Sequence, residues 1–358
     1  MNPRPFGELP TGEPVEAHTL SNSSGASAEV LTYGCIVRSL RVPDRDGRCT
    51  DVVLGFDSLQ AYVEGRAYHG AIVGRIAGRV GGGRLLVDGR EHLLPLNDGP
   101  NHLHGGRRGL DRRVWSAHPA EAPPGGSSLR LRYLSPSGEE GYPGTVSITV
   151  TYTLTADNAL VIETEAASDR PTPVSLTHHG YFNLAGDGSG TVLDHEVSVC
   201  ADAYVPAGSS MAPSDRRESV DGRGADLRRP RRLGDALPEL AGAHGDLYLL
   251  RPAGGSLPAE PTPAARVADP ASGRVLQVAT NDACIQFYTG VALDGGRAGK
   301  SGAPYGPHSG LCLECEGYPH AGRVEAFGDI VVRPGLPQTR RTVYAFATDR
   351  RPLSYQPT

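Results

Sequence analysis

The sequence predicts an all-β fold built from large antiparallel sheets, and three observations support this prediction. The 358 residues include 47 glycines and 30 prolines, about a fifth of the chain, and both residue types disfavour helix interiors. Many segments alternate apolar and polar residues with the period of two that is typical of a half-buried strand. No segment shows a long helical period or an internal repeat. These features exclude a helical bundle or a solenoid.

The strand signals run along most of the chain. Residues 84–94 predict a hairpin, because Asp88-Gly89 supplies the two positive φ angles that a type I′ turn requires. Other segments with strand character lie at residues 129–133, 146–154, 160–165, 192–200, 274–280, 284–288, 311–316 and 341–347. Residues 205–240 and 251–263 have the composition of irregular excursions. About fifteen strands in total is the number expected of a large antiparallel sandwich.

The length also bears on domain organisation. A chain of 358 residues would suit two average domains, but β sandwiches of this size also occur as one domain. Strands resume on both sides of each irregular segment without a shift in composition. We therefore predict a single domain over residues 1–358.

Charge and hydropathy narrow the range of partners. The net charge of −5 and the isoelectric point near 6.2 provide no concentrated positive face, which excludes nucleic acid and anionic membranes as partners. No run of 18 apolar residues occurs, and the first residues have neither the basic nor the apolar region of a signal peptide. We expect a cytoplasmic protein that acts on a neutral or small molecule.

The six cysteines give no sign of a disulfide framework, because they are scattered along the chain, and free thiols are expected. Cys312 and Cys315 have the spacing of half a zinc or redox motif. They lie in a predicted strand, however, where positions three apart point to opposite faces. No metal site is predicted from them.

Three clusters combine histidine or glutamate with glycines and aromatic residues, at 101–106, 176–186 and 308–319. In the first, His102 and His104 would share one strand face and could bind a metal or one ligand. No carboxylate follows, as a metal-binding barrel of the cupin type would require. A structural role is the simpler interpretation of His102.

Glu314 is the most unusual residue of the third cluster, because it lies between Leu313 and Cys315 in an apolar strand. A buried carboxylate there would need a partner or would stay protonated. If the strand lines a cleft, burial near a histidine would bring both pKa values toward neutrality, as a general acid/base pair requires. The alternative is that Glu314 faces solvent on an edge strand. Serine-nucleophile elbows, dinucleotide fingerprints and P-loops are absent from the sequence.

The order of these clusters resembles the aldose 1-epimerase (galactose mutarotase) family. The resemblance is carried by Leu-His-Gly-Gly at 103–106 with Arg-Gly at 108–109, by Thr-His-His-Gly-Tyr-Phe-Asn-Leu-Ala-Gly at 177–186 and by His-Ser-Gly-Leu-Cys-Leu-Glu at 308–314. Further matching stretches lie at residues 19–22, 51–56, 73–79, 137–143 and 285–290. The resemblance implies a β-supersandwich of antiparallel sheets with a ligand cleft on a concave face.

The resemblance also implies roles for individual residues. His179 matches the acid that protonates the pyranose ring oxygen, and Glu314 matches the base that removes the anomeric hydroxyl proton. His104 matches a histidine that binds the sugar near the reacting centre, and Arg79 and Gln286 match residues that bind sugar hydroxyls. Two opposed groups suffice for opening a hemiacetal ring, so no cofactor and no metal are expected.

Departures from the family pattern gather around these residues. Gly78 and His178 each stand where the family has asparagine, and Glu316 stands where it has glutamine. The sugar-binding aspartate aligns with Gly245, and only a slip of one residue would supply Asp246 instead. His178 and Asp246 are therefore candidate substrate contacts, and His178 could share the proton transfer.

Three functions remain open at this point. The first is a true aldose 1-epimerase that acts on galactose, glucose or a related sugar. The second is an enzyme of the same fold that uses the same pair for dehydration and Michael-type addition of a hydroxylated, for example polyketide, metabolite. The third is a carbohydrate-binding protein without catalysis. A monomer or a homodimer is expected.

Overall fold

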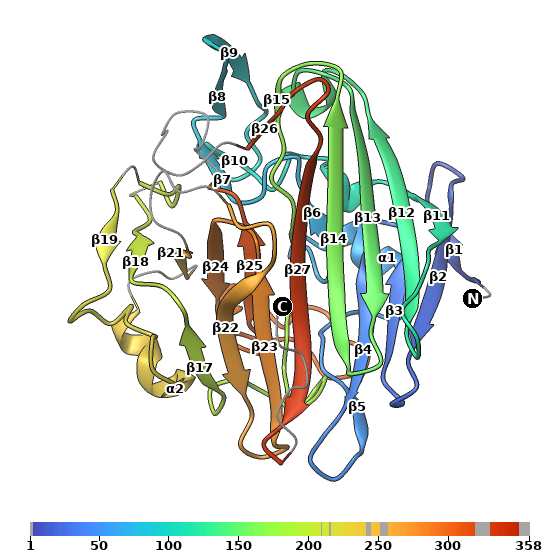
Figure 1. Ribbon diagram of the computed structural model, residues 1–358, viewed down its shortest axis with the longest axis vertical. Coiled ribbons are helices and arrows are strands. Elements are labelled where there is room, and N and C mark those ends of the chain that lie inside the picture. Colours follow the sequence, from blue (N-terminus) through green and yellow to red (C-terminus); the bar gives the residue numbers. More distant parts are fainter. Residues whose placement is uncertain are drawn as a thin grey trace.

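The computed structural model describes residues 3–208, 210–214, 216–240, 245–250, 257–318 and 330–350, and antiparallel strands dominate them (Figure 1). Three large sheets of nine, five and five strands are accompanied by four two-stranded ribbons. Every pairing between the named strands is antiparallel. The long strands of the nine-stranded sheet run side by side in the middle of Figure 1. The predicted all-β fold is confirmed.

The nine-stranded sheet provides much of the core. In order across the sheet its strands are β11 (Ser116–Pro119), β12 (Ser127–Ser135), β13 (Val146–Leu154), β14 (Ala159–Ser168), β27 (Gln338–Thr348), β23 (Arg274–Thr280), β22 (Thr262–Ala268), β17 (Glu196–Val199) and β20 (Arg231–Arg232). The period-two pattern of β13 is explained by this placement, because Val146, Ile148 and Val150 are fully buried while the residues between them are at least partly exposed. Burying each such side chain stabilises the fold by roughly 1.5–3 kcal/mol.

Two five-stranded sheets complete the scaffold. The first is built from β1 (Arg4–Glu8), β2 (Pro14–Ser21), β3 (Ser27–Leu31), β4 (Val37–Pro43) and β5 (Cys49–Asp51), in sequence order. The second has the order β19 (Glu218–Ser219), β18 (Ala203–Val205), β21 (Asp246–Leu249), β24 (Cys284–Tyr288) and β25 (Cys312–Glu316). The second sheet carries Glu314 on β25 and Gln286 directly opposite it on β24.

Short elements connect these sheets. The ribbons pair β6 (Ile72–Val73) with β16 (Thr177–His178), β7 (Arg79–Gly81) with β10 (Asn101–Leu103), β8 (Arg84–Val87) with β9 (Arg90–Leu93), and β15 (Thr172–Pro173) with β26 (Val331–Val332). The helical turns are α1 (Leu59–Glu64), η1 (Leu110–Arg112), η2 (Glu139–Gly141), α2 (Leu233–Ala236) and η3 (Leu237–Glu239). Within the described ranges, no helix has the length and apolar character needed to span a membrane.

The predicted strands agree with the structure except at one place. The hairpin of β8 and β9 is confirmed, and its turn residues Asp88 and Gly89 have φ angles of 47° and 78°. The strand predicted over 192–200 begins only at Glu196, because the preceding residues form a turn in which the His195 amide donates to the Val192 carbonyl. The strand number was underestimated, since ribbons of two or three residues are too short to show a period.

The free edge of β25 is covered, and this arrangement positions the candidate site. The Phe182 amide donates to the Leu311 carbonyl at 2.8 Å, and the Gly317 amide donates to Ser175 Oγ at 2.9 Å. The segment 175–182 therefore lies along an edge that would otherwise face solvent. Glu314 is only 3% exposed as a result, so the alternative of a solvent-facing Glu314 is wrong.

Candidate functional site

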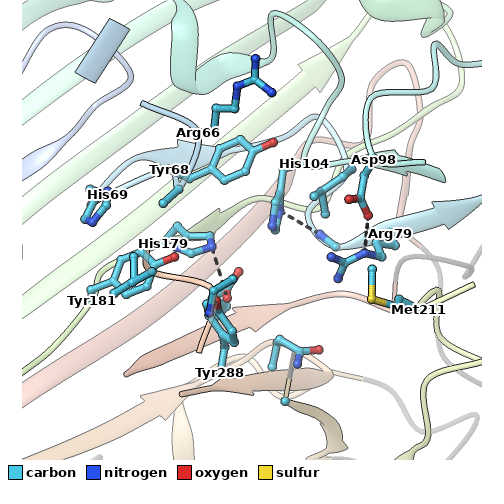
Figure 2. Close-up of a pocket in the computed structure, with 18 of the residues that line it drawn as sticks. Arg66, Tyr68, His69, Arg79, Asp98, His104, His179, Tyr181, Met211 and Tyr288 are labelled. Carbon is cyan, nitrogen blue, oxygen red and sulfur yellow. Dashed lines mark hydrogen bonds and ion pairs between the residues drawn. The ribbon is translucent and has the colours of Figure 1, made fainter. Parts of the chain in front are cut away.

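A cavity of about 800 Å³ lies on the face of β24 and β25 that carries Gln286 and Glu314. Its wall also includes residues 64–69, the start of β7 and the end of β10, and it is completed by residues within 205–208, 211–213 and 292–297. Figure 2 shows His179, His104 and Arg79 approaching the cavity from different elements. The structure thus brings together five predicted site residues, namely Arg79, His104, His179, Gln286 and Glu314.

Glu314 and His179 face each other at the floor of the cavity. His179 Nε2 lies 3.6 Å from Glu314 Oε1, and both side chains are at least 95% buried. Burial raises the pKa of Glu314 to about 8, a shift that Arg79 partly opposes, and burial lowers the pKa of His179 to about 4. Both groups are therefore neutral at pH 7, with the shared proton on Glu314. They can exchange that proton with each other or with a ligand placed between them.

The fold fixes the orientation of His179 from several sides. Its backbone amide donates to the Ala71 carbonyl, and its own carbonyl accepts from the Gly70 amide, both at 2.8 Å. The ring is flanked by Tyr181, with centroids 5.1 Å apart, and its Nδ1 lies 3.7 Å from Cys312 Sγ. Because Nδ1 is occupied by the buried thiol, Nε2 is the nitrogen that faces Glu314.

His104 owes its position to the glycines that follow it. It has a left-handed φ of 51°, and Gly105 packs so closely on the Gly74 carbonyl that an added Cβ would lie 1.6 Å from that oxygen. This contact explains why the chain needs glycine directly after the histidine. The Gly78 amide donates to His104 Nδ1 at 3.2 Å, so Nε2 carries the proton of the neutral ring. Burial lowers the pKa of His104 well below its usual value, which makes the ring a neutral hydrogen-bond donor.

His104, His179 and Glu314 also form a possible metal-ligand set, because their ligand atoms lie within 4.8 Å of one another. A metal ion would need a lone pair on His104 Nε2. The hydrogen bond from the Gly78 amide places the lone pair on Nδ1 instead. The backbone at Gly78 therefore disfavours metal coordination at this cluster.

Arg79 and Gln286 border the floor of the cavity. Arg79 Nε donates to Asp98 Oδ2 at 2.7 Å, and this ion pair holds the guanidinium at the cavity wall (Figure 2). Gln286 lies opposite Glu314 in the register of β24 and β25. Both side chains can donate hydrogen bonds to hydroxyl groups of a ligand beside Glu314.

Two other predicted contacts are not brought to the cavity. His178 points away from it and packs between Phe182 and Tyr344, with ring centroids 6.3 and 5.6 Å away. Asp246 is buried but does not line the cavity, because Gly245 and Leu247 occupy the cavity face of β21 and alternation turns Asp246 to the other face. The structure therefore does not bring His178 and Asp246 to the cavity that Glu314 lines.

The backbone at Gly245 also prevents a side chain from reaching the cavity there. Gly245 has a φ of 80°, and an added Cβ would lie 1.7 Å from the Phe287 carbonyl oxygen. The aspartate that the family resemblance places at this position would require a different course of the chain. Among the described residues of β21, position 245 therefore offers no carboxylate to the cavity.

We expect Gly245→Ala to lower the free energy of unfolding by about 2–5 kcal/mol, from the clash and the strained φ combined. Urea denaturation would measure the change. Gly306→Ala is a suitable control, because an added Cβ there meets open space and no positive φ has to be kept. Equal stability of the two variants would contradict the packing described at Gly245.

The structural role predicted for His102 and the free thiols predicted for the cysteines are both confirmed. His102 is fully buried, and its ring nitrogens lie 2.6 Å from the Tyr142 hydroxyl and 2.8 Å from the Pro95 carbonyl oxygen, which is a structural role. All six cysteines are free, and Cys312 and Cys315 point to opposite faces of β25: Cys312 approaches His179, whereas Cys315 lies in the core beneath the sheet.

Several residues of the cavity were not predicted. Tyr68 and Asp98 line it from loops outside the matching stretches, and Tyr181 and Tyr288 line it from within stretches to which no role had been assigned for these two residues. Glu316 also lines the cavity, on the same face of β25 as Glu314. The period of two in a strand was a signal that could have identified Glu316 from the sequence.

Comparisons with known proteins agree with this geometry. Residues 16–345 match the family model of aldose 1-epimerase. The chain is 41% identical to a galactose mutarotase of Rattus norvegicus over 344 residues, which cover 96% of this chain and 97% of the relative. It is 40% identical to the galactose mutarotase of Homo sapiens with the same coverage, and 32% identical to an aldose 1-epimerase of Escherichia coli over 95% and 97% of the two chains.

Solved structures show the same fold. An aldose epimerase homologue from C. elegans superimposes with a TM-score of 0.84 at 30% identity, over 93% of this chain and 99% of the other. A galactose 1-epimerase from Lactobacillus acidophilus superimposes with a TM-score of 0.82 at 28% identity, over 97% and 98% of the two chains.

Proposed function

The chain belongs to the aldose 1-epimerase family, and on this basis we propose that it is an isomerase that interconverts the α and β anomers of an aldose. Glu314 acts as the base at the anomeric hydroxyl and His179 as the acid at the ring oxygen. The observation that carries the proposal is the opposed pair itself, with His179 Nε2 and Glu314 Oε1 3.6 Å apart on the floor of a large cavity.

The reaction needs only a proton relay. When Glu314 takes the proton from O1 and His179 gives one to O5, the C1–O5 bond breaks and an open aldehyde forms. Rotation about C1–C2 presents the other face of the carbonyl to the O5 hydroxyl. The two residues then reverse their roles while the ring closes. His104, through Nε2–H, and Arg79 donate hydrogen bonds to oxygens that gain charge during these steps.

The active pair must hold one proton in total. Below a pH of about 4 both groups are protonated, so the base is lost. Above a pH of about 8 both are deprotonated, so the acid is lost. Between these limits the proton can move from Glu314 to His179 and produce the reactive form.

We therefore expect kcat/KM to be nearly constant between about pH 4 and pH 8 and to fall tenfold per pH unit beyond each limit. Anomeric NMR at a series of pH values would measure the profile, with circular dichroism to confirm that the protein stays folded. A profile with a single limb would show that only one of the two groups takes part.

Polarimetry with freshly dissolved α-D-glucose and α-D-galactose tests the function itself. The proposal requires mutarotation that is faster than the spontaneous rate and proportional to enzyme concentration. The absence of this acceleration across common aldoses, with a folded protein, would refute it.

The relatives are named as mutarotases or epimerases, and the chain matches them over nearly their whole length. They give no support to the dehydration and addition reaction or to carbohydrate binding without catalysis. We further propose that the chain is a single domain over residues 1–358, which the family match over residues 16–345 supports, and that its small-molecule substrate is a sugar. The cytoplasmic location and the choice between monomer and homodimer stay predictions.

A further inference from the structure

Glu316 is a second carboxyl group on the floor of the cavity. It lies two residues after Glu314 on β25, so the two side chains share one face at a Cα separation of roughly 7 Å. Glu316 is only 1% exposed, and its Oε2 has no hydrogen-bond partner in the part of the chain that the structure describes. A buried carboxyl oxygen of this kind is costly unless a ligand satisfies it.

The charges around Glu316 favour a positively charged ligand group. Two of the three guanidinium groups that line the cavity within the described ranges are already held in ion pairs, Arg79 with Asp98 and Arg297 with Glu64. The charge of Arg79 lowers the pKa of both Glu314 and Glu316, but its guanidinium already forms an ion pair with Asp98. Burial, Glu314 and Asp282 all raise the pKa of Glu316. A cation placed between Glu316 and the open cavity would therefore restore its ionised form.

The position of His179 indicates which part of a sugar lies near Glu316. His179 approaches Glu314 from the side of Cys312, whereas Glu316 lies on the opposite side along the strand. In an aldopyranose, C1 is flanked by O5 and C2. With O1 at Glu314 and O5 at His179, C2 and its substituent extend toward Glu316.

We propose that the cavity is selective for 2-amino-2-deoxyaldoses, whose ammonium group pairs with the carboxylate of Glu316. This inference rests on the proposed function, because it uses the placement of O1 and O5 by Glu314 and His179. The missing carboxylate at Gly245 and the additional one at Glu316 together change which sugar the cavity binds.

Mutarotation of four sugars by the full-length protein tests the proposal. D-glucosamine carries the ammonium group, D-glucose a hydroxyl, N-acetyl-D-glucosamine an uncharged amide, and 2-deoxy-D-glucose no polar group at C2. A charge-assisted hydrogen bond predicts a kcat/KM for glucosamine that exceeds that for glucose by roughly tenfold to a hundredfold, measured below the pKa of the amine. The amide and the deoxy sugar should be no better than glucose.

Variants of Glu316 identify the group responsible. Glu316→Gln should abolish the preference for glucosamine, measured as the ratio of kcat/KM for glucosamine to kcat/KM for glucose. Glu316→Asp keeps the charge and should retain part of the preference, which guards against a folding defect in the first variant. Glu8→Gln, at an exposed site on β1, removes the same charge outside the cavity and should leave the preference unchanged.

The possible outcomes separate the two proposals. If the protein epimerises glucose and glucosamine equally well, or if Glu316→Gln keeps the preference, the inference is wrong and the proposed function stands. If none of the four sugars is epimerised above the spontaneous rate, the proposed function itself fails.

Discussion

Replacing Glu314 with glutamine is expected to lower kcat for mutarotation by about 10²–10⁴-fold, the contribution typical of a positioned general base. Glutamine has nearly the same shape but cannot accept the anomeric proton. Because the contacts that we propose for Arg79, His104 and Gln286 are kept, KM should change far less than kcat. Polarimetry and anomeric NMR at several sugar concentrations would separate the two constants.

Stability provides an internal check on the same variant. Burial raises the pKa of Glu314 to about 8, so ionisation of this group opposes folding increasingly as the pH rises from its unfolded-state pKa to about 8. Glu314→Gln removes this opposition and should be at least as stable as the natural protein at pH 8. Glu165→Gln, at an exposed position of β14, is the matched control and should change neither activity nor stability. Activity of Glu314→Gln within tenfold of the natural protein would rule out Glu314 as the base.

Replacing His179 with asparagine is the second change with a large expected effect, again about 10²–10⁴-fold in kcat. Asparagine cannot deliver a proton to the ring oxygen. The pH profile should also change: the loss of rate above pH 8 disappears, because no acid remains to be deprotonated. The remaining activity should instead rise through the pKa of Glu314 and then stay constant. Rates measured by anomeric NMR across this pH range would show the change.

The adjacent residue offers a control for this variant. His178 is equally buried but packs against Phe182 and Tyr344 outside the cavity, so His178→Asn should keep activity within tenfold. If His178→Asn lost as much activity as His179→Asn, or if His179→Asn kept the alkaline limb, the assignment of the acid would be wrong.

The sequence predicted the general fold and five residues of the cavity for physical reasons. Period-two alternation identifies strands such as β13 because one of its faces is buried. Glu314 was conspicuous because an ionisable group is costly in an apolar strand. Motif order then connected it with His179, 135 positions earlier in the chain. These signals depend on local composition or on the order of motifs, and both are visible in one sequence.

What could not be predicted depends on contacts between distant segments. Segment 175–182 covers the free edge of β25, and no local pattern shows that this edge is buried. The face of the sheet on which Asp246 lies depends on the pairing register of β21 with β24, and a shift of one residue would turn Asp246 to the opposite face. Glu316 lies on the same strand face as Glu314, but the sequence alone does not show that this face lines a cavity.

Interconversion of the α and β anomers at equilibrium, followed by two-dimensional exchange NMR of their H1 signals, tests the acid/base account most directly. It detects ring opening without any net change in the solution. The account predicts cross peaks between the α and β H1 signals of an aldose that grow with enzyme concentration and disappear in Glu314→Gln and His179→Asn. Cross peaks of undiminished intensity with both folded variants, or none with the natural protein, would contradict it.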